Sequence, residues 1–79
     1  MSPDTQRSIE SFFKEYGIID ADQKAKILPE ITNIIYSYNM AVVKAEKETD
    51  EYKKKQALVG VKEWHSKIDE IFTDFLNKR

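Results

Sequence analysis

The first apolar pattern of the chain lies close to its start. Its members recur at positions i, i+3, i+4 and i+7, the spacing of one helix face: Ile9, Phe12, Phe13 and Tyr16. Ser2 is placed to cap this helix, and Pro3 suits its first position. Gly17 supplies the left-handed residue that ends many helices, with Ile18 able to fold back on the last turn. The pattern predicts a helix over about residues 3–16.

A longer apolar stripe follows, with alternating steps of three and four residues. Its members are Leu28, Ile31, Ile35, Tyr38, Val42 and Ala45, and Ile27, Ile34 and Ala41 widen it. Pro29 falls inside the pattern and removes one backbone hydrogen bond. It either kinks a helix that starts near Ala21 or begins a new helix after a short turn. We expect the second alternative, with a helical turn near residues 21–27, capped by Asp20, and a main helix over about residues 29–48.

The third stripe occupies the last part of the chain. It comprises Ala57, Val61, Trp64, Ile68, Ile71 and Phe75, and it is broadened by Leu58, Phe72 and Leu76. A charged stretch, residues 44–56, separates it from the second stripe and contains Thr49 and Asp50, which can cap a new helix. We therefore expect a helix over about residues 51–77 that forms an antiparallel hairpin with the second helix. The alternative is one long helix through both segments. We attribute Gly60, inside the third helix, to the close approach of a neighbouring helix.

Together the three stripes predict one all-α domain, residues 1–79, built as a small bundle of three main helices. A domain of this length buries only roughly 60–65% of the surface that its unfolded chain exposes, so a monomer is marginally stable. The chain has no Cys, and its single His cannot form a site of several imidazoles within one chain. Association with a second copy is the remaining way to reinforce the fold.

The balance of charge argues against a polyanionic partner. Thirteen basic and fourteen acidic residues give a net charge of −1 at pH 7. Such a chain has no basic field for nucleic acid or an anionic membrane. The longest uncharged stretch, residues 31–43, is too short and too polar to span a bilayer, and the first residues lack the pattern of a signal peptide. We expect a cytoplasmic protein.

The second helix carries a further apolar stripe on the side opposite its main one. Tyr36, Met40 and Val43 form this stripe, at positions i, i+4 and i+7. One interpretation is that the second helix is sandwiched between the other two and buried on both sides. The other is that these residues dock another molecule, since Tyr and Met are favoured at interfaces. We predict that Tyr36, Met40 and Val43 bind a protein partner, with a homodimer of paired hairpins as the expected assembly.

No arrangement of residues indicates catalysis. The chain has no Gly-rich phosphate loop, no nucleophile elbow and no pair of carboxylates on an apolar face. His65 and Asp69 lie one helical turn apart and can form a pH-sensitive hydrogen bond or hold a metal, but two ligands are too few for a tight site. We expect His65 at the edge of the core and Trp64 within it. The sequence predicts no metal, no cofactor and no small-molecule substrate.

These observations favour a small non-enzymatic protein–protein interaction module that self-associates and acts as an accessory or inhibitory binder. The alternative is a helical nucleic-acid-binding regulator, in which the turn near residues 21–27 and the following helix form a helix-turn-helix. Its recognition face around Asn33 and Ser37 is nearly neutral, and neighbouring acidic residues offset the basic run 53–55. We therefore do not expect nucleic acid as the partner.

Overall fold

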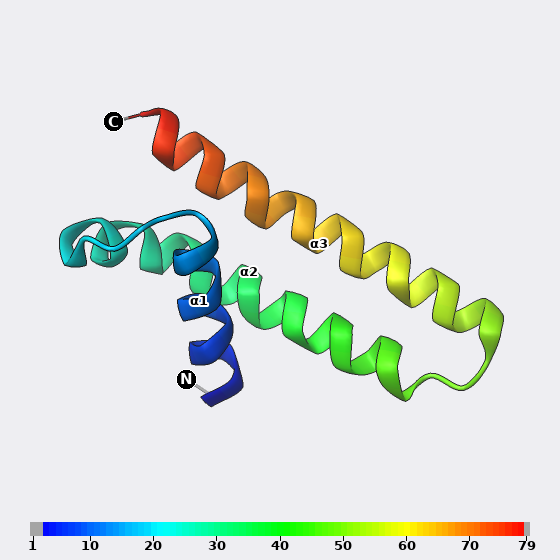
Figure 1. Ribbon diagram of the computed structural model, residues 1–79. Helices are drawn as coiled ribbons and strands as arrows, with labels where there is room; N and C mark the ends of the chain where they lie inside the picture. Colours follow the sequence, from blue (N-terminus) through cyan, green and yellow to red (C-terminus); the bar gives the residue numbers. More distant parts are fainter. Residues whose placement is uncertain (1–2, 79) are drawn as a thin grey trace.

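Three helices make up the part of the chain that the computed structural model describes, residues 3–78. They are α1 (Pro3–Glu15), α2 (Ala21–Lys47) and α3 (Glu51–Asn77). α2 and α3 form an antiparallel hairpin, and α1 crosses α2 near the open end of that hairpin (Figure 1). The molecule is elongated, with extents of 44 × 25 × 18 Å. The predicted all-α bundle with a hairpin is confirmed, and the break at residues 48–50 excludes one long helix.

The end of α1 follows the local signal in the sequence. Gly17 has a φ of +71°, in the left-handed region. Its N–H donates to the carbonyl of Lys14 at 3.2 Å, and the N–H of Ile18 donates to that of Phe13 at 2.8 Å. These two bonds form a Schellman motif, and Ile18 is folded back into the core with 1% of its surface exposed. The predicted cap at Ser2 lies outside the described residues.

Aspartate side chains cap the other two helices, as predicted. The Asp20 carboxylate accepts from the N–H groups of Asp22 at 2.8 Å and Gln23 at 3.3 Å. The Asp50 carboxylate accepts from the N–H of Lys53 at 3.0 Å. Each cap satisfies N–H groups that have no partner within the helix and places a negative charge at the positive end of the helix dipole.

α2 runs without interruption through Pro29, so the prediction of a separate turn before a helix starting near Pro29 is wrong. Pro29 removes the N–H that would reach the carbonyl of Ala25. Both residues are exposed, so water can hydrate that carbonyl. The isoleucines on the opposite face of α2 are fully buried: Ile27, Ile31 and Ile35. Burial stabilises by roughly 1.5–3 kcal/mol for each such side chain, which together exceeds a proline cost of about 3 kcal/mol.

The core lies where α1 covers the hairpin. Its buried residues are Ile9, Phe12, Phe13, Ile18, Ile27, Ile31, Ile35, Ile68 and Phe72. Phe72 of α3 is at its centre, because its ring meets those of two α1 residues and of Tyr16, which directly follows α1. The ring centroids are 4.5 Å apart for Tyr16, 6.1 Å for Phe12 and 6.2 Å for Phe13. Aromatic side chains of α1 and Tyr16 therefore connect the end of α1 to Phe72 of α3.

Two hydrogen bonds between side chains also connect α1, and Tyr16 directly after it, to the hairpin. The Ser8 hydroxyl donates to Oδ1 of Asn39 at 2.9 Å, and the Tyr16 hydroxyl donates to Oδ1 of Asp69 at 2.6 Å. Partial burial, followed by the hydrogen bond and charge of Asp69 and the charge of Glu15, raises the pKa of Tyr16 above its ordinary value. Tyr16 therefore keeps its proton, and its bond to Asp69, into the alkaline range.

Candidate protein interaction surface

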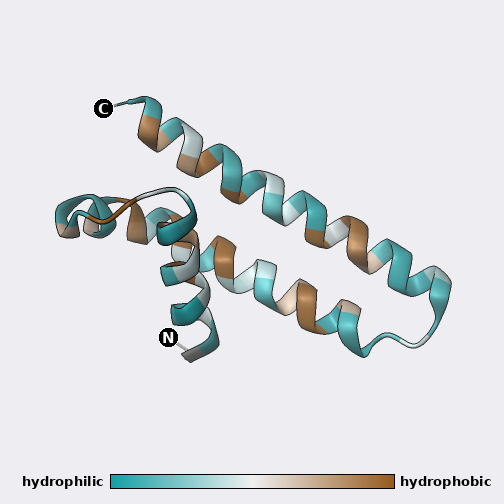
Figure 2. Cartoon of the chain, viewed as in Figure 1, coloured by the Kyte–Doolittle hydropathy of each residue, from teal (hydrophilic) through white to brown (hydrophobic). Residues whose placement is uncertain are grey.

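The half of the hairpin nearest its tip extends beyond α1. Ser8 of α1 reaches Asn39, and Phe12 lies with its ring centroid 6.0 Å from that of His65. Past this level, among residues 3–78, only α2 and α3 pack together, and apolar positions continue along both helices toward the tip (Figure 2). The small side chain of Ala45 is buried there, 2% exposed, and lines a hollow together with Leu58 and Val61 of α3. A hairpin of two helices cannot bury all of its apolar side chains, so several remain in contact with solvent.

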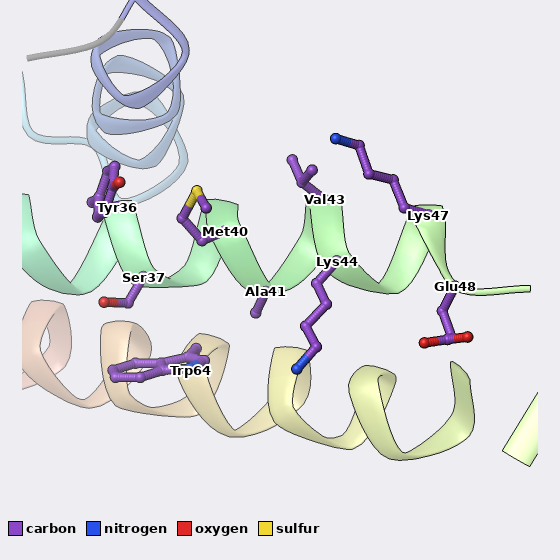
Figure 3. A pocket seen from close by; sticks show the side chains of 9 residues that line it. All are labelled: Tyr36, Ser37, Met40, Ala41, Val43, Lys44, Lys47, Glu48 and Trp64. Atoms are coloured by element: carbon purple, nitrogen blue, oxygen red, sulfur yellow. The ribbon is translucent and has the colours of Figure 1, made fainter. Parts of the chain in front are cut away.

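The three predicted partner-binding residues lie together on one such surface, which we call the α2 face. Tyr36, Met40 and Val43 project from α2 away from α3, and they are 50%, 53% and 40% exposed (Figure 3). α2 does pack against both α1 and α3, as the sandwich interpretation expects, but that interpretation is wrong in burying this second stripe. The reason is the position of α1, which packs beside the α2 face, at Asn39, and does not cover it.

An open groove of about 710 Å³ runs beside the α2 face, between α2 and α3. It is lined by Tyr36, Ser37, Met40, Ala41, Val43, Lys44, Lys47, Glu48 and Trp64 (Figure 3). Trp64, predicted to lie in the core, is half-buried and forms the α3 side of the groove. The Nζ atom of Lys67 lies 5.0 Å from the centroid of the Trp64 ring and forms a cation–π contact with it. The apolar stripe of α3 placed Trp64 on the correct side of the helix but did not show that the side is only half covered.

Gly60 borders this open side of the hairpin. A Cβ atom added to Gly60 would meet no neighbouring heavy atom within 4 Å. The prediction that another helix approaches closely at Gly60 is therefore wrong. Gly60 lines a second hollow with Ala57, Lys44 and Lys53, on the tip side of the groove. The glycine leaves space that no side chain of the hairpin fills.

The charged groups around the groove are mostly ammonium groups without a partner. Among residues 3–78 the ion pair is that of Lys24 with Glu10, at 3.8 Å, and it lies between α1 and α2. Lys44 and Lys47 thus line the groove with no carboxylate bound to them. The Glu48 carboxylate accepts a hydrogen bond from the N–H of Asp50, in the turn that follows, at 3.2 Å. The surface combines apolar side chains with a positive end near the hairpin tip.

His65 lies at the edge of the core, as predicted. It is exposed, and its ring centroid is 6.0 Å from those of both Phe12 and Tyr38. Asp69, one turn later, accepts the hydroxyl of Tyr16 instead of pairing with His65. Within the described range no three side chains of the types His, Cys, Asp and Glu gather closely enough to hold a metal ion. The chemistry available at this surface is apolar contact and charge.

Among residues 3–78 no helix combines the length and the apolar character needed to cross a membrane. Comparison of the chain with protein-family models, with curated proteins and with solved structures finds no match. Its function is therefore inferred from the surface itself.

Proposed function

We propose that this protein is a non-enzymatic helical interaction module that self-associates through the α2 face and acts as an accessory or inhibitory binder. The observation that carries the proposal is the exposure of Tyr36, Met40 and Val43 on a side of α2 that neither α1 nor α3 covers. A helix that is apolar on two opposed sides is normally buried on both. α3 covers one side of α2, and α1 leaves the other open. A helix from another chain would complete the burial.

The total surface supports an association of this kind. The accessible surface is 5896 Å². The scaling for compact monomers gives about 5,000 Å² for a chain of 9.3 kDa, which leaves an excess of about 900 Å². A standard protein–protein interface buries roughly 800 Å² on each partner. The excess surface of the whole molecule is therefore comparable to the area that one such interface would bury.

The helix-turn-helix form of the nucleic-acid alternative is not supported. It required two short helices joined by a turn before Pro29, and α2 is continuous through that position.

The absence of Cys fits a reducing compartment, and we propose the cytoplasm as the location of the protein.

Sedimentation velocity of the wild type and two matched variants tests the proposal. The wild type is expected to form a dimer whose fraction rises with concentration. Met40→Asp places a carboxylate in the middle of the α2 face and is expected to weaken the dimer at least about tenfold, because burying an unpaired charge costs well over 1.4 kcal/mol. Val59→Asp is the control, since Val59 is equally exposed, at 55% against 53% for Met40, but lies on α3.

Circular dichroism must show that both variants keep the helical content of the wild type. A wild type that stays monomeric at every concentration contradicts self-association. A dimer that Met40→Asp and Val59→Asp weaken to the same extent contradicts the assignment of the interface to the α2 face.

A further inference from the structure

We infer that two copies of this chain pair through α2 in an antiparallel orientation, about a two-fold axis between residues 39 and 40. The inference rests on the proposed function and adds which residues meet. Tyr36 and Val43 lie equally far from that point along α2, on the same side of the helix. An antiparallel copy therefore sets Tyr36 opposite the partner's Val43, and the symmetry repeats the contact. Met40 then lies at the centre, against the partner's Met40.

The lysines at the end of α2 favour this orientation over a parallel one. Lys47 lies on the same side of α2 as Val43, and Lys44 lines the groove beside it (Figure 3). In a parallel pair each lysine would face its own copy in the partner. In the antiparallel pair Lys44 lies level with residue 35 of the other copy and Lys47 with residue 32, inside the uncharged stretch 31–43. The antiparallel pair thus brings no like charges together along the seam.

The distribution of charge along the whole molecule points to the same orientation. The tip half, residues 40–62, holds six basic and four acidic residues, whereas the remainder of the chain holds seven basic and ten acidic residues. The hairpin tip is therefore positive, and the end that carries α1 is negative. Antiparallel pairing brings each tip toward the negative end of the partner. Charges of this kind select orientation, while the apolar side chains of the α2 face supply the affinity.

Cysteine cross-linking tests the orientation, and the chain provides a clean background because it has no Cys. In the antiparallel pair Met40→Cys lies next to its own copy and is expected to form a disulfide-linked dimer on oxidation. Tyr36→Cys and Val43→Cys each lie about 10 Å from their own copy along the helix axis, at 1.5 Å per residue. That distance exceeds the roughly 7 Å between Cα atoms that a disulfide can bridge.

An equimolar mixture of Tyr36→Cys and Val43→Cys is therefore expected to give a cross-linked dimer at least about tenfold more efficiently than either variant alone. Peptide mapping would identify the bond between positions 36 and 43. Sedimentation of the reduced variants must first show that each still associates, because only then can their cross-linking be compared.

The remaining outcomes distinguish a failure of the antiparallel orientation from a failure of the proposed self-association. Efficient self-cross-linking of Tyr36→Cys and Val43→Cys would show a parallel pair, which overturns this inference and leaves the proposed function standing. A wild type that dimerises while none of the three variants cross-links places the interface elsewhere and overturns both. A wild type that remains monomeric overturns the proposed self-association, and this inference with it.

Discussion

The same substitution is expected to have opposite effects at the two glycines of the chain. Gly60→Ala and Gly17→Ala each add one methyl group, and at either position the new Cβ atom would meet no neighbouring heavy atom within 4 Å. Space is therefore equal at the two sites, and only the backbone differs. Gly60 lies inside α3, whereas Gly17 has a φ of +71°.

The magnitudes follow from those conformations. In a helix interior Ala is favoured over Gly by about 1 kcal/mol, and at Gly60 no clash offsets the gain. In the left-handed region a Cβ atom costs roughly 1–2 kcal/mol, so Gly17→Ala is expected to destabilise by that amount. At about 2.1 cal/mol/K per residue, the entropy of unfolding of 79 residues converts 1 kcal/mol into about 6 °C. Tm is expected to rise by about 6 °C for Gly60→Ala and to fall by about 6–12 °C for Gly17→Ala.

Thermal unfolding followed by circular dichroism measures both effects. The two substitutions are best made in the Met40→Asp background, because association with a second copy raises the apparent stability by mass action. A fall in Tm for Gly60→Ala would show that a neighbouring group does approach Gly60. The hairpin would then not be open beside Gly60.

Two further changes test the core and its link to α1. Phe72→Ala removes a fully buried ring that contacts the aromatic rings of Phe12, Phe13 and Tyr16. The expected loss of about 3–5 kcal/mol approaches the whole stability of a domain this small, and a urea midpoint close to that of the wild type would contradict the central position of Phe72. Tyr16→Phe keeps the ring on Phe72 but loses the hydrogen bond to Asp69, at a cost of about 1 kcal/mol at neutral pH. Because the pKa of Tyr16 is raised in the folded state, the unfolded chain loses this proton first, and the wild type is expected to lose stability as the pH rises above about 10. The free energy of unfolding of Tyr16→Phe should fall less than that of the wild type above this pH. Parallel pH curves for the two proteins would show that Tyr16 does not cause the loss.

Local signals were sufficient to predict the helices and most of their ends. The cap at Asp50 and the left-handed Gly17 act through neighbouring backbone groups, which the sequence alone specifies. Pro29 also gives a local signal, but here it was misleading. The burial of isoleucines on the far side of α2 depends on contacts with α1 and α3, and these contacts decide whether the helix continues.

The candidate surface could be predicted only in part, again because burial depends on contacts with the other helices. The spacing of Tyr36, Met40 and Val43 shows that they share one side of α2, but not whether another helix covers that side. This depends on where α1 packs, and no local pattern fixes that position. The position of α1 also brings Phe72, expected at the border of its stripe, to the centre of the core, and leaves Trp64 beside an open groove.

The most direct test of the central claim, that the α2 face joins two copies of this chain, is the mass of the wild type in solution by sedimentation equilibrium. We predict a mass that rises with concentration toward twice the 9.3 kDa of a single chain, and that Met40→Asp returns to the single-chain value. A wild type that keeps the mass of one chain over the whole concentration range would contradict the claim.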